Sequence, residues 1–198
     1  NAMDRQDMTK VLESTKGKGL VVLDEAYIEF NMESSVVKLL NEYPHLVVLR
    51  TLSKAFGRAG LRCGFIMTNP EIISILQKVS APYPIPVPVV DLASEALSES
   101  GINCMMLDVE TLWKDRQKLN DMLKEFSFVK TIYPTVANFF LFQVENAVEL
   151  MSFLSEKGVV IRNQSSQIGL ENTVRVTVGT ELEIVAFYKS MKQFEAQL

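Results

Sequence analysis

Apolar and polar positions follow two spacings along the first half of the chain, and each spacing predicts one kind of element. Short uninterrupted apolar runs at 20–23 and 46–49 are typical of strands that are buried on both faces. The remaining pattern predicts a further strand over 63–68 and helices over 4–14, 34–43 and 70–80. Because strands alternate with helices, the sequence favours a parallel sheet covered by helices, which is an α/β fold.

The second half of the chain is organised differently. Prolines at alternating positions in 81–88 predict a stiff extended linker, since proline fixes φ and removes a backbone donor. Helical spacing of apolar residues then predicts a long helix over 103–126. Beyond it we expect helices over 147–157 and 181–195, and strands over 128–133, 139–144, 159–162 and 173–178. We therefore expect part of a large domain in residues 1–102 and a small α+β domain, entered through the long helix, in residues 103–198.

Composition narrows the class of protein. The 198 residues are 47% hydrophobic, as in a globular protein with a core, and the formal net charge is −4. No basic stripe is present, so we expect no nucleic-acid partner, and no apolar run approaches the roughly 20 residues of a membrane span. Cys63 and Cys104 lack the spacing of a metal site, and two free thiols fit a cytoplasmic protein. Residues 1–2, before Met3, are typical of the remnant of an expression tag.

The segment that follows the second apolar run suits an aldehyde cofactor that carries a phosphate. Lys54 comes shortly after the strand and can form a Schiff base with an aldehyde. Ser53 and Arg62 can hold phosphate oxygens, and Gly57 and Gly60 allow the backbone to approach a ligand closely.

The first apolar run ends in a second pair of candidate residues. Asp24 can hold the ring nitrogen of pyridoxal phosphate in its protonated form, which this cofactor needs in order to accept electrons. Tyr27, three residues further on, can donate a hydrogen bond to the ring oxygen. Carboxyl ends of strands are where ligands bind in open α/β sheets, so Asp24 and Lys54 are expected at one edge.

These motifs, with Ala81-Pro-Tyr-Pro84 and Val174-Arg-Val-Thr-Val-Gly-Thr180, closely resemble the fold-type I pyridoxal-phosphate aminotransferases. Among them they resemble the histidinol-phosphate aminotransferase family most, from about residue 4 to 192. The resemblance covers only the carboxyl-terminal portion of such an enzyme. It implies a homodimer, pyridoxal 5′-phosphate as cofactor, Lys54 as the catalytic lysine, and transamination between histidinol phosphate and 2-oxoglutarate in histidine biosynthesis.

Two arginines are candidates for binding the substrate. Arg175 lies inside an alternating apolar strand, where a guanidinium is costly unless an anion meets it. The resemblance implies the same role for Arg175. Arg162 ends the predicted strand at 159–162 and is a candidate for a second anion contact, near the substrate phosphate.

Two alternatives remain open at this stage. A related pyridoxal-phosphate enzyme, such as an aromatic aminotransferase or a threonine-phosphate decarboxylase, would share the same motif residues. The chain can also be a non-catalytic folded fragment that serves as a dimerisation domain. In this family the absent half supplies the aromatic residue that stacks on the cofactor and part of the phosphate site, so we expect the isolated chain to be inactive.

Overall fold

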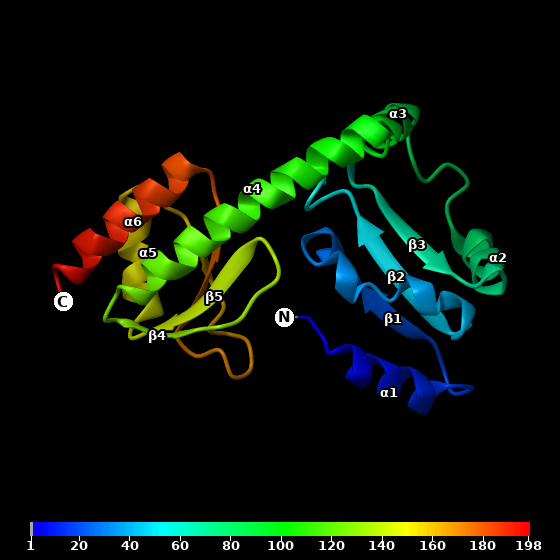
Figure 1. Cartoon of the computed structure of the whole chain (residues 1–198), viewed down its shortest axis with the longest axis horizontal. Helices are drawn as coiled ribbons and strands as arrows, with labels where there is room; N and C mark the ends of the chain where they lie inside the picture. The colour runs from blue at the N-terminus through cyan, green and yellow to red at the C-terminus, as the bar shows by residue number, and fades with distance from the viewer. Residues whose placement is uncertain (1) are drawn as a thin grey trace. The chain divides into compact units, whose positions relative to one another are not determined.

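The computed structural model describes residues 2–198, which form two compact units (Figure 1). The first unit is Ala2–Val109 and the second is Glu110–Leu198. The division falls within α4 (Glu99–Lys124), a helix of 26 residues that begins earlier than the predicted start at 103. The hydroxyl of Ser98 explains this earlier start, because it accepts a hydrogen bond from Gly101 N at 3.1 Å, as a helix cap does.

A three-stranded sheet in the order β1-β2-β3 forms the centre of the first unit. It consists of β1 (Val21–Asp24), β2 (Leu46–Thr51) and β3 (Gly64–Thr68). The first two strands are parallel, as expected, but β3 is antiparallel to β2. The expectation of a wholly parallel sheet was therefore wrong for the third strand. The reason is that the connection between β2 and β3 contains one 3₁₀ turn, η4 (Ala59–Leu61), instead of a crossover helix.

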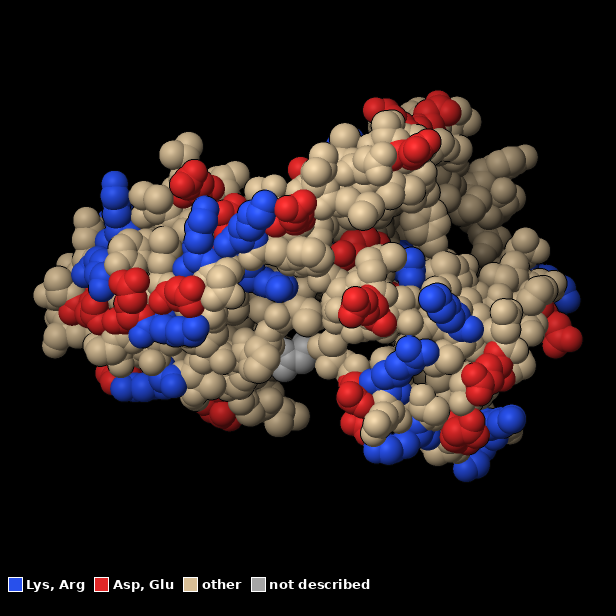
Figure 2. Space-filling model, in the orientation of Figure 1, with Lys and Arg blue, Asp and Glu red and all other residues tan. Residues whose placement is uncertain are grey.

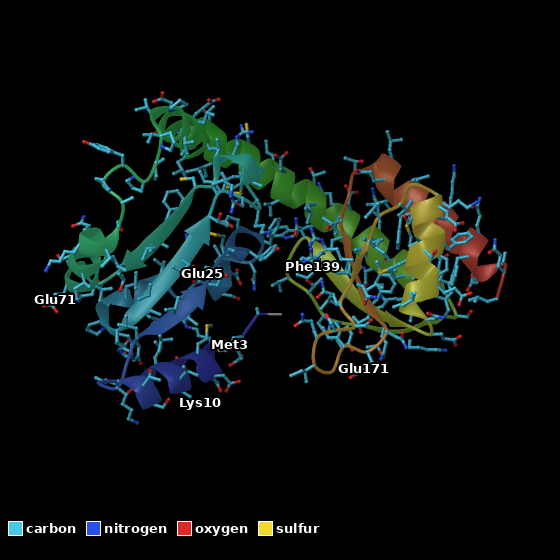
Figure 3. The ribbon with its side chains drawn as sticks, turned by 180° about the vertical axis from the view of Figure 1, so that it is seen from behind. Met3, Lys10, Glu25, Glu71, Phe139 and Glu171 are labelled. Atoms are coloured by element: carbon cyan, nitrogen blue, oxygen red, sulfur yellow. The ribbon has the colours of Figure 1, made fainter. Side chains whose placement is uncertain are left out.

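Helix α1 (Arg5–Thr15) packs on this sheet through Met8 and Leu12, which contact β1 and β2 in one buried cluster. Asp4 caps its N-terminus by accepting a hydrogen bond from Gln6 N at 2.8 Å. Burial of a side chain such as Leu12 contributes about 1.5–3 kcal/mol. Figure 3 shows the sheet from behind, with Lys10 on α1 and Glu25 at the strands.

The helix predicted over 34–43 is absent, and that prediction was wrong. Three short 3₁₀ turns fill this part of the chain: η1 (Ile28–Phe30), η2 (Met32–Ser34) and η3 (Val37–Asn41). The backbone N–H of Val36 donates to the carboxylate of Glu25 at 2.7 Å, and Ser35 is extended at φ −62° and ψ 135°. A helix cannot run through an extended residue, so only a single 3₁₀ turn fits before Pro44.

Prolines shape the end of the first unit. Helix α2 (Pro70–Val79) is capped by Asn69 and has a proline in its first turn, as predicted. The chain after it is irregular as far as Pro86, but α3 (Val87–Ala96) then begins inside the predicted linker. Proline is tolerated in the first turn of a helix, where its missing N–H has no partner anyway, so Pro88 does not prevent this helix.

The second unit is an antiparallel sheet covered by helices. The strands β4 (Val129–Ile132), β5 (Phe139–Val144), β7 (Thr173–Thr177) and β6 (Arg162–Asn163) are paired in that order. Alternate residues of β5 and β7 join α5 (Ala147–Glu156), α6 (Glu181–Glu195) and the last turns of α4 in one core, which contains Leu123, Phe142, Leu154, Val174 and Met191. Strand β6 is shorter than predicted, because Val159 N donates to Leu154 O at 2.8 Å and is not available to the sheet.

A close approach between β2 and β3 generates a first testable prediction. A Cβ added to Gly64 would lie 2.8 Å from the carbonyl oxygen of Arg50, which is too close for any side chain. We expect Gly64→Ala to lower the free energy of unfolding by about 1–3 kcal/mol, measured by urea denaturation.

The matched control is Gly19→Ala, because a Cβ at Gly19 would meet nothing within 4 Å. This control is expected to change the free energy of unfolding by less than about 0.5 kcal/mol. Equal effects of the two substitutions would contradict the tight packing of β3 on β2.

Candidate functional site

The candidate cofactor residues gather where β1 and β2 end. Asp24 is the last residue of β1 and pairs in register with Leu49 of β2, while Lys54 follows the end of β2 by three residues. Because the two strands are parallel, Asp24 and Lys54 belong to the same edge of the sheet, as the sequence predicted. The Asp24 carboxylate is exposed, and its Oδ1 accepts a hydrogen bond from Ala26 N at 2.9 Å. That bond orients the side chain and leaves other lone pairs of the carboxylate accessible.

Tyr27 lies beside Lys54. The Nζ of Lys54 is 5.0 Å from the centroid of the Tyr27 ring, within the range of a cation–π interaction. The Tyr27 ring also contacts the ring of Phe30, a buried residue, at a centroid distance of 6.3 Å. An amine from one part of the sequence and a carboxylate and a phenol from another are therefore held at one sheet edge.

Ser53 and Arg62 lie at the two ends of the loop that joins β2 to β3. The pairing of β2 with β3 places Thr51 opposite Gly64 and continues through a hydrogen bond from Leu52 N to Cys63 O at 3.2 Å. Ser53 and Arg62 are the residues that directly follow and precede this last bond, so both belong to the base of the loop. The Arg62 guanidinium also donates to Ala59 O at 3.0 Å within its own turn.

The loop between these two residues turns sharply just after Lys54. Gly57 has φ +63°, its N–H donates to Lys54 O at 3.0 Å, and Arg58 N donates to Leu52 O at 2.9 Å. Arg62 is also left-handed, with φ 52°, which costs a residue with a side chain about 1–2 kcal/mol. Such backbone strain often marks functional sites.

Two residues of this edge were missed as site residues by the sequence analysis. The hydroxyl of Thr51 accepts a hydrogen bond from Ser53 N at 3.1 Å and lies 2.9 Å from Ser53 Oγ, so it orients the Ser53 hydroxyl. Arg50 forms an ion pair with Glu25. The available signal for Arg50 was a charged residue at the end of an apolar run, the same signal that identified Arg162.

In the second unit, the two candidate substrate arginines are direct cross-strand neighbours. Arg162 of β6 pairs with Arg175 of β7, so their side chains leave the sheet on the same face. The guanidinium of Arg175 also lies 5.1 Å from the ring centroid of Phe139. Both arginines, with Gly158 and Glu183, line a cavity of about 460 Å³. Like charges directly opposite one another destabilise a sheet, so this pair favours an anion between them.

The remaining charges show no other strong candidate. Acidic and basic side chains are interspersed on the face shown in Figure 2. Among residues 2–198, no cluster of His, Cys, Asp and Glu has the size needed to hold a metal ion. No helix in this part of the chain is both long and apolar enough to cross a membrane. The imidazole of His45 lies 3.0 Å from Leu12 O and 3.3 Å from Thr15 Oγ1. His45 directly precedes β2, whereas Lys54 follows the opposite end of that strand.

A lysine and a carboxylate at the carboxyl edge of an α/β sheet are compatible with the class of fold-type I cofactor-dependent enzymes. Residues 1–188 match the family model "Aminotransferase class I and II", and the chain belongs to this family. Histidinol-phosphate aminotransferase 2 of Mannheimia succiniciproducens is 45% identical over 184 residues, which are 93% of this chain and 53% of that protein. The chain therefore spans about half the length of this relative.

Solved structures agree with this family. Histidinol-phosphate aminotransferase from Clostridium acetobutylicum matches with a TM-score of 0.92 and 27% identity, over 99% of this chain and 60% of that one. L-threonine-O-3-phosphate decarboxylase from Porphyromonas gingivalis matches with a TM-score of 0.83 and 24% identity, over 97% of this chain and 59% of that one. The resemblance and the fold class expected from the sequence are confirmed, whereas the roles of the individual site residues stay predictions.

A buried carboxyl beside the site generates a prediction on pH dependence. Glu29 Oε2 is buried and has no hydrogen-bond partner. Burial raises the pKa of the Glu29 carboxyl and the nearby Glu25 raises it further, against the opposing effects of its own backbone N–H and of Arg50. Because the folded pKa lies above the unfolded one, the ionised group destabilises the fold at higher pH, and this penalty disappears below the unfolded pKa.

We therefore expect Glu29→Gln to raise the Tm at neutral pH and to leave it unchanged below the ordinary pKa of glutamate. The exposed Glu33, four residues further on, provides the control Glu33→Gln, which should show no such difference. Differential scanning calorimetry at the two pH values measures both variants. A Tm gain of Glu29→Gln that does not depend on pH would contradict the role of ionisation.

Proposed function

We propose that this chain carries the cofactor-binding lysine and the substrate-binding arginines of a pyridoxal-phosphate-dependent aminotransferase. Its proposed reaction transfers an amino group between histidinol phosphate and 2-oxoglutarate, with glutamate as the other amino compound, in histidine biosynthesis. The 45% identity to histidinol-phosphate aminotransferase 2 of Mannheimia succiniciproducens supports this substrate. We further expect a cytoplasmic homodimer.

The observation that carries the proposal is the placement of Asp24 and Lys54 at the ends of neighbouring parallel strands, with the Tyr27 ring 5.0 Å from Lys54 Nζ. The chemistry of these groups fits pyridoxal phosphate. When bound, this cofactor withdraws electrons from the substrate carbon that bears the amino group. Lys54 would hold it covalently, Asp24 would pair with the ring nitrogen, and Tyr27 would donate to the ring oxygen.

Ser53 and Arg62 suit the phosphate group of the cofactor. The two residues at the base of this loop offer one hydroxyl donor and one charged fork, a combination that binds phosphate oxygens well. The proposal gives Lys54 a second role. Its amine would be the general base that takes the proton from the substrate carbon.

The arginine pair Arg162 and Arg175 suits the substrate. A phosphorylated amino compound and a dicarboxylic oxo acid both carry anionic groups, and either would relieve the repulsion between two directly opposed guanidinium groups. The proposal assigns the carboxylate or phosphate of the substrate to this pair.

A second candidate function is decarboxylation of a threonine phosphate. The similarity in fold to the Porphyromonas gingivalis decarboxylase, at a TM-score of 0.83, favours it as an alternative. The motif residues would be the same in both enzymes, and so would those of an aromatic aminotransferase. Product analysis with histidinol phosphate, an aromatic amino acid and threonine phosphate separates the three activities. A chain that acts only as a folded dimerisation domain would give no product with any of them.

The cofactor assignment is tested by chemical trapping. The protein at its natural length is mixed with pyridoxal phosphate and reduced with borohydride, and peptide mass spectrometry locates the adduct. We expect it on Lys54, and we expect Lys54→Ala to abolish transamination while the Tm stays unchanged, since Lys54 is exposed. The control is Lys78→Ala, in the exposed last turn of α2, which should retain both adduct and activity. An adduct on Lys78 or Lys157 would disprove the assignment.

The substrate assignment is tested at Arg175. We expect Arg175→Ala to weaken substrate binding by about 2–4 kcal/mol, because a charged contact at a partly buried position is lost. Binding of pyridoxal phosphate should be unaffected, and the fold should not lose stability, since a like-charge contact with Arg162 is removed.

Arg175→Lys is the matched variant, because it keeps the charge and loses the bidentate fork. It should fall between the wild type and Arg175→Ala when substrate KM and cofactor Kd are measured side by side. Unchanged substrate affinity in Arg175→Ala would show that this arginine is structural.

A further inference from the structure

Glu25 is the residue directly after Asp24, and it is only 8% exposed. Its backbone N–H donates to Leu49 O at 2.8 Å, which extends the pairing of β1 with β2 by one residue. The Glu25 side chain is buried, whereas the carboxylate of the neighbouring Asp24 is exposed. A buried carboxylate at this position needs partners, because an unpaired buried charge is strongly destabilising.

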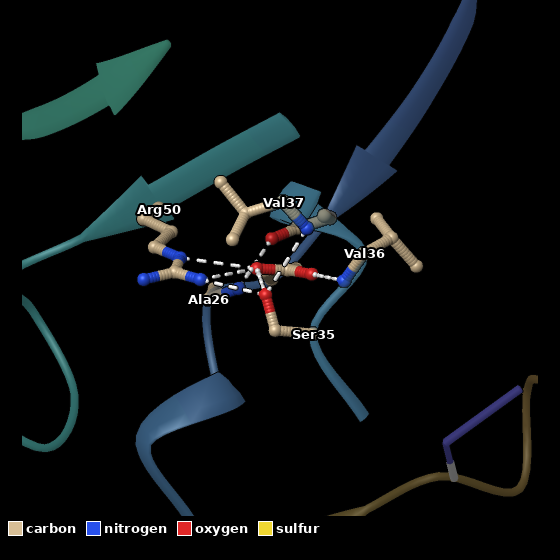
Figure 4. Close-up of polar contacts among 7 residues, drawn as sticks. Ala26, Ser35, Val36, Val37 and Arg50 are labelled. Carbon is tan, nitrogen blue, oxygen red and sulfur yellow. Dashed lines mark hydrogen bonds and ion pairs between the residues drawn. The ribbon is translucent and has the colours of Figure 1, made fainter. Parts of the chain in front are cut away.

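The Glu25 carboxylate has partners on two other segments (Figure 4). Oε1 accepts a hydrogen bond from Val36 N at 2.7 Å. Oε2 accepts from Ser35 Oγ at 3.1 Å and from Arg50 at 3.0 Å through Nε, with a second guanidinium nitrogen at 2.9 Å. Arg50 also donates to Ser35 Oγ at 2.8 Å, which closes the network. We call Glu25, Arg50, Ser35 and the Val36 N–H the Glu25 clamp.

The clamp joins the parts of the chain that carry the proposed cofactor residues. Glu25 directly follows Asp24. Arg50 lies on β2, four residues before Lys54. The third part of the clamp, at Ser35 and Val36, closes the segment that begins at Glu25 and contains Tyr27. The relative positions of all three residues therefore depend on one buried carboxylate.

We propose that Glu25 is a positioning residue, which holds Tyr27 and Asp24 in place against Lys54 through the clamp. This inference rests on the proposed function for its catalytic consequence. The clamp is suited to positioning more than to stability, because a buried ion pair contributes little net stability compared with apolar packing. The clamp fixes orientation, since the planar guanidinium of Arg50 donates to Glu25 Oε2 through two nitrogens in a defined geometry.

A measurement without cofactor tests the geometry. In the chain with ¹³C-labelled lysine, the Lys54 methylene next to Nζ should show a ring-current shift from Tyr27, assigned by its loss in Lys54→Arg and in Tyr27→Leu. We expect Glu25→Gln to abolish most of this shift, because the amide loses the charge and its NH2 group faces the donors of either Arg50 or Val36.

The control is Leu12→Ala. Leu12 is fully buried in the cluster between α1 and the sheet, so this substitution destabilises the same unit without touching the clamp. The Lys54 shift should survive it under conditions where both variants are folded. A shift that is retained in Glu25→Gln, or lost equally in Leu12→Ala, would overturn the proposal.

Kinetics of the protein at its natural length test the catalytic consequence. A misplacement of about 1 Å costs on the order of 10²-fold in rate, so Glu25→Gln and Arg50→Lys should lower kcat by about this factor with a much smaller change in KM. Leu12→Ala should keep its kcat at a temperature well below its Tm. A kcat of Glu25→Gln equal to that of the wild type would overturn the positioning role. If the wild type forms no adduct on Lys54 but the ring-current shift depends on Glu25, the clamp stands and the proposed function fails.

Discussion

The parallel pairing of β1 with β2 is the constraint on which the site depends. Parallel strands end at the same edge of a sheet, so a carboxylate at the end of one strand and an amine after the next belong to the same edge. The register places Asp24 opposite Leu49, five residues before Lys54. A shift of one residue in this pairing would turn the side chains of β1 to the opposite face and separate the two groups.

The local pattern of apolar positions identified the strands that consist of an unbroken apolar run and the helices that have regular helical spacing. The runs that became β1 and β2, and the helical spacing of α1, α2 and α6, were enough to place these elements within about one or two residues. The same runs placed Asp24 and Lys54 at strand ends. The pattern failed where a distant side chain decided the local structure, as at Val36, whose N–H is taken by Glu25 from another segment. It also failed at β3, because apolar alternation carries no information on strand direction.

Site geometry was predictable only in part for the same reason. The sequence suggested Ser53 and Arg62 as partners in phosphate binding, and the antiparallel pairing of β2 with β3 is what brings both residues to the base of one loop. It suggested Arg162 and Arg175 separately, and the direct opposition of the two guanidinium groups became visible only with the pairing of β6 and β7. Arg50 and Thr51 were missed, because their importance lies in hydrogen bonds to residues that are distant in the sequence or that were already assigned other roles.

The hydrogen bond between Leu52 and Cys63 has a consequence for the thermodynamics of ligand capture. It closes the segment 53–62 at its base, and the antiparallel pairing of β2 with β3 supports that closure. The entropy cost of closing this loop is therefore met when the chain folds and not when an anion binds. A preorganised loop of this kind gives affinity that depends on charge and on salt concentration more than on the ordering of a flexible loop. An anion bound between Ser53 and Arg62 would also link the two ends of this loop. Binding of the anion would therefore raise the local stability of β2 and β3 near the loop.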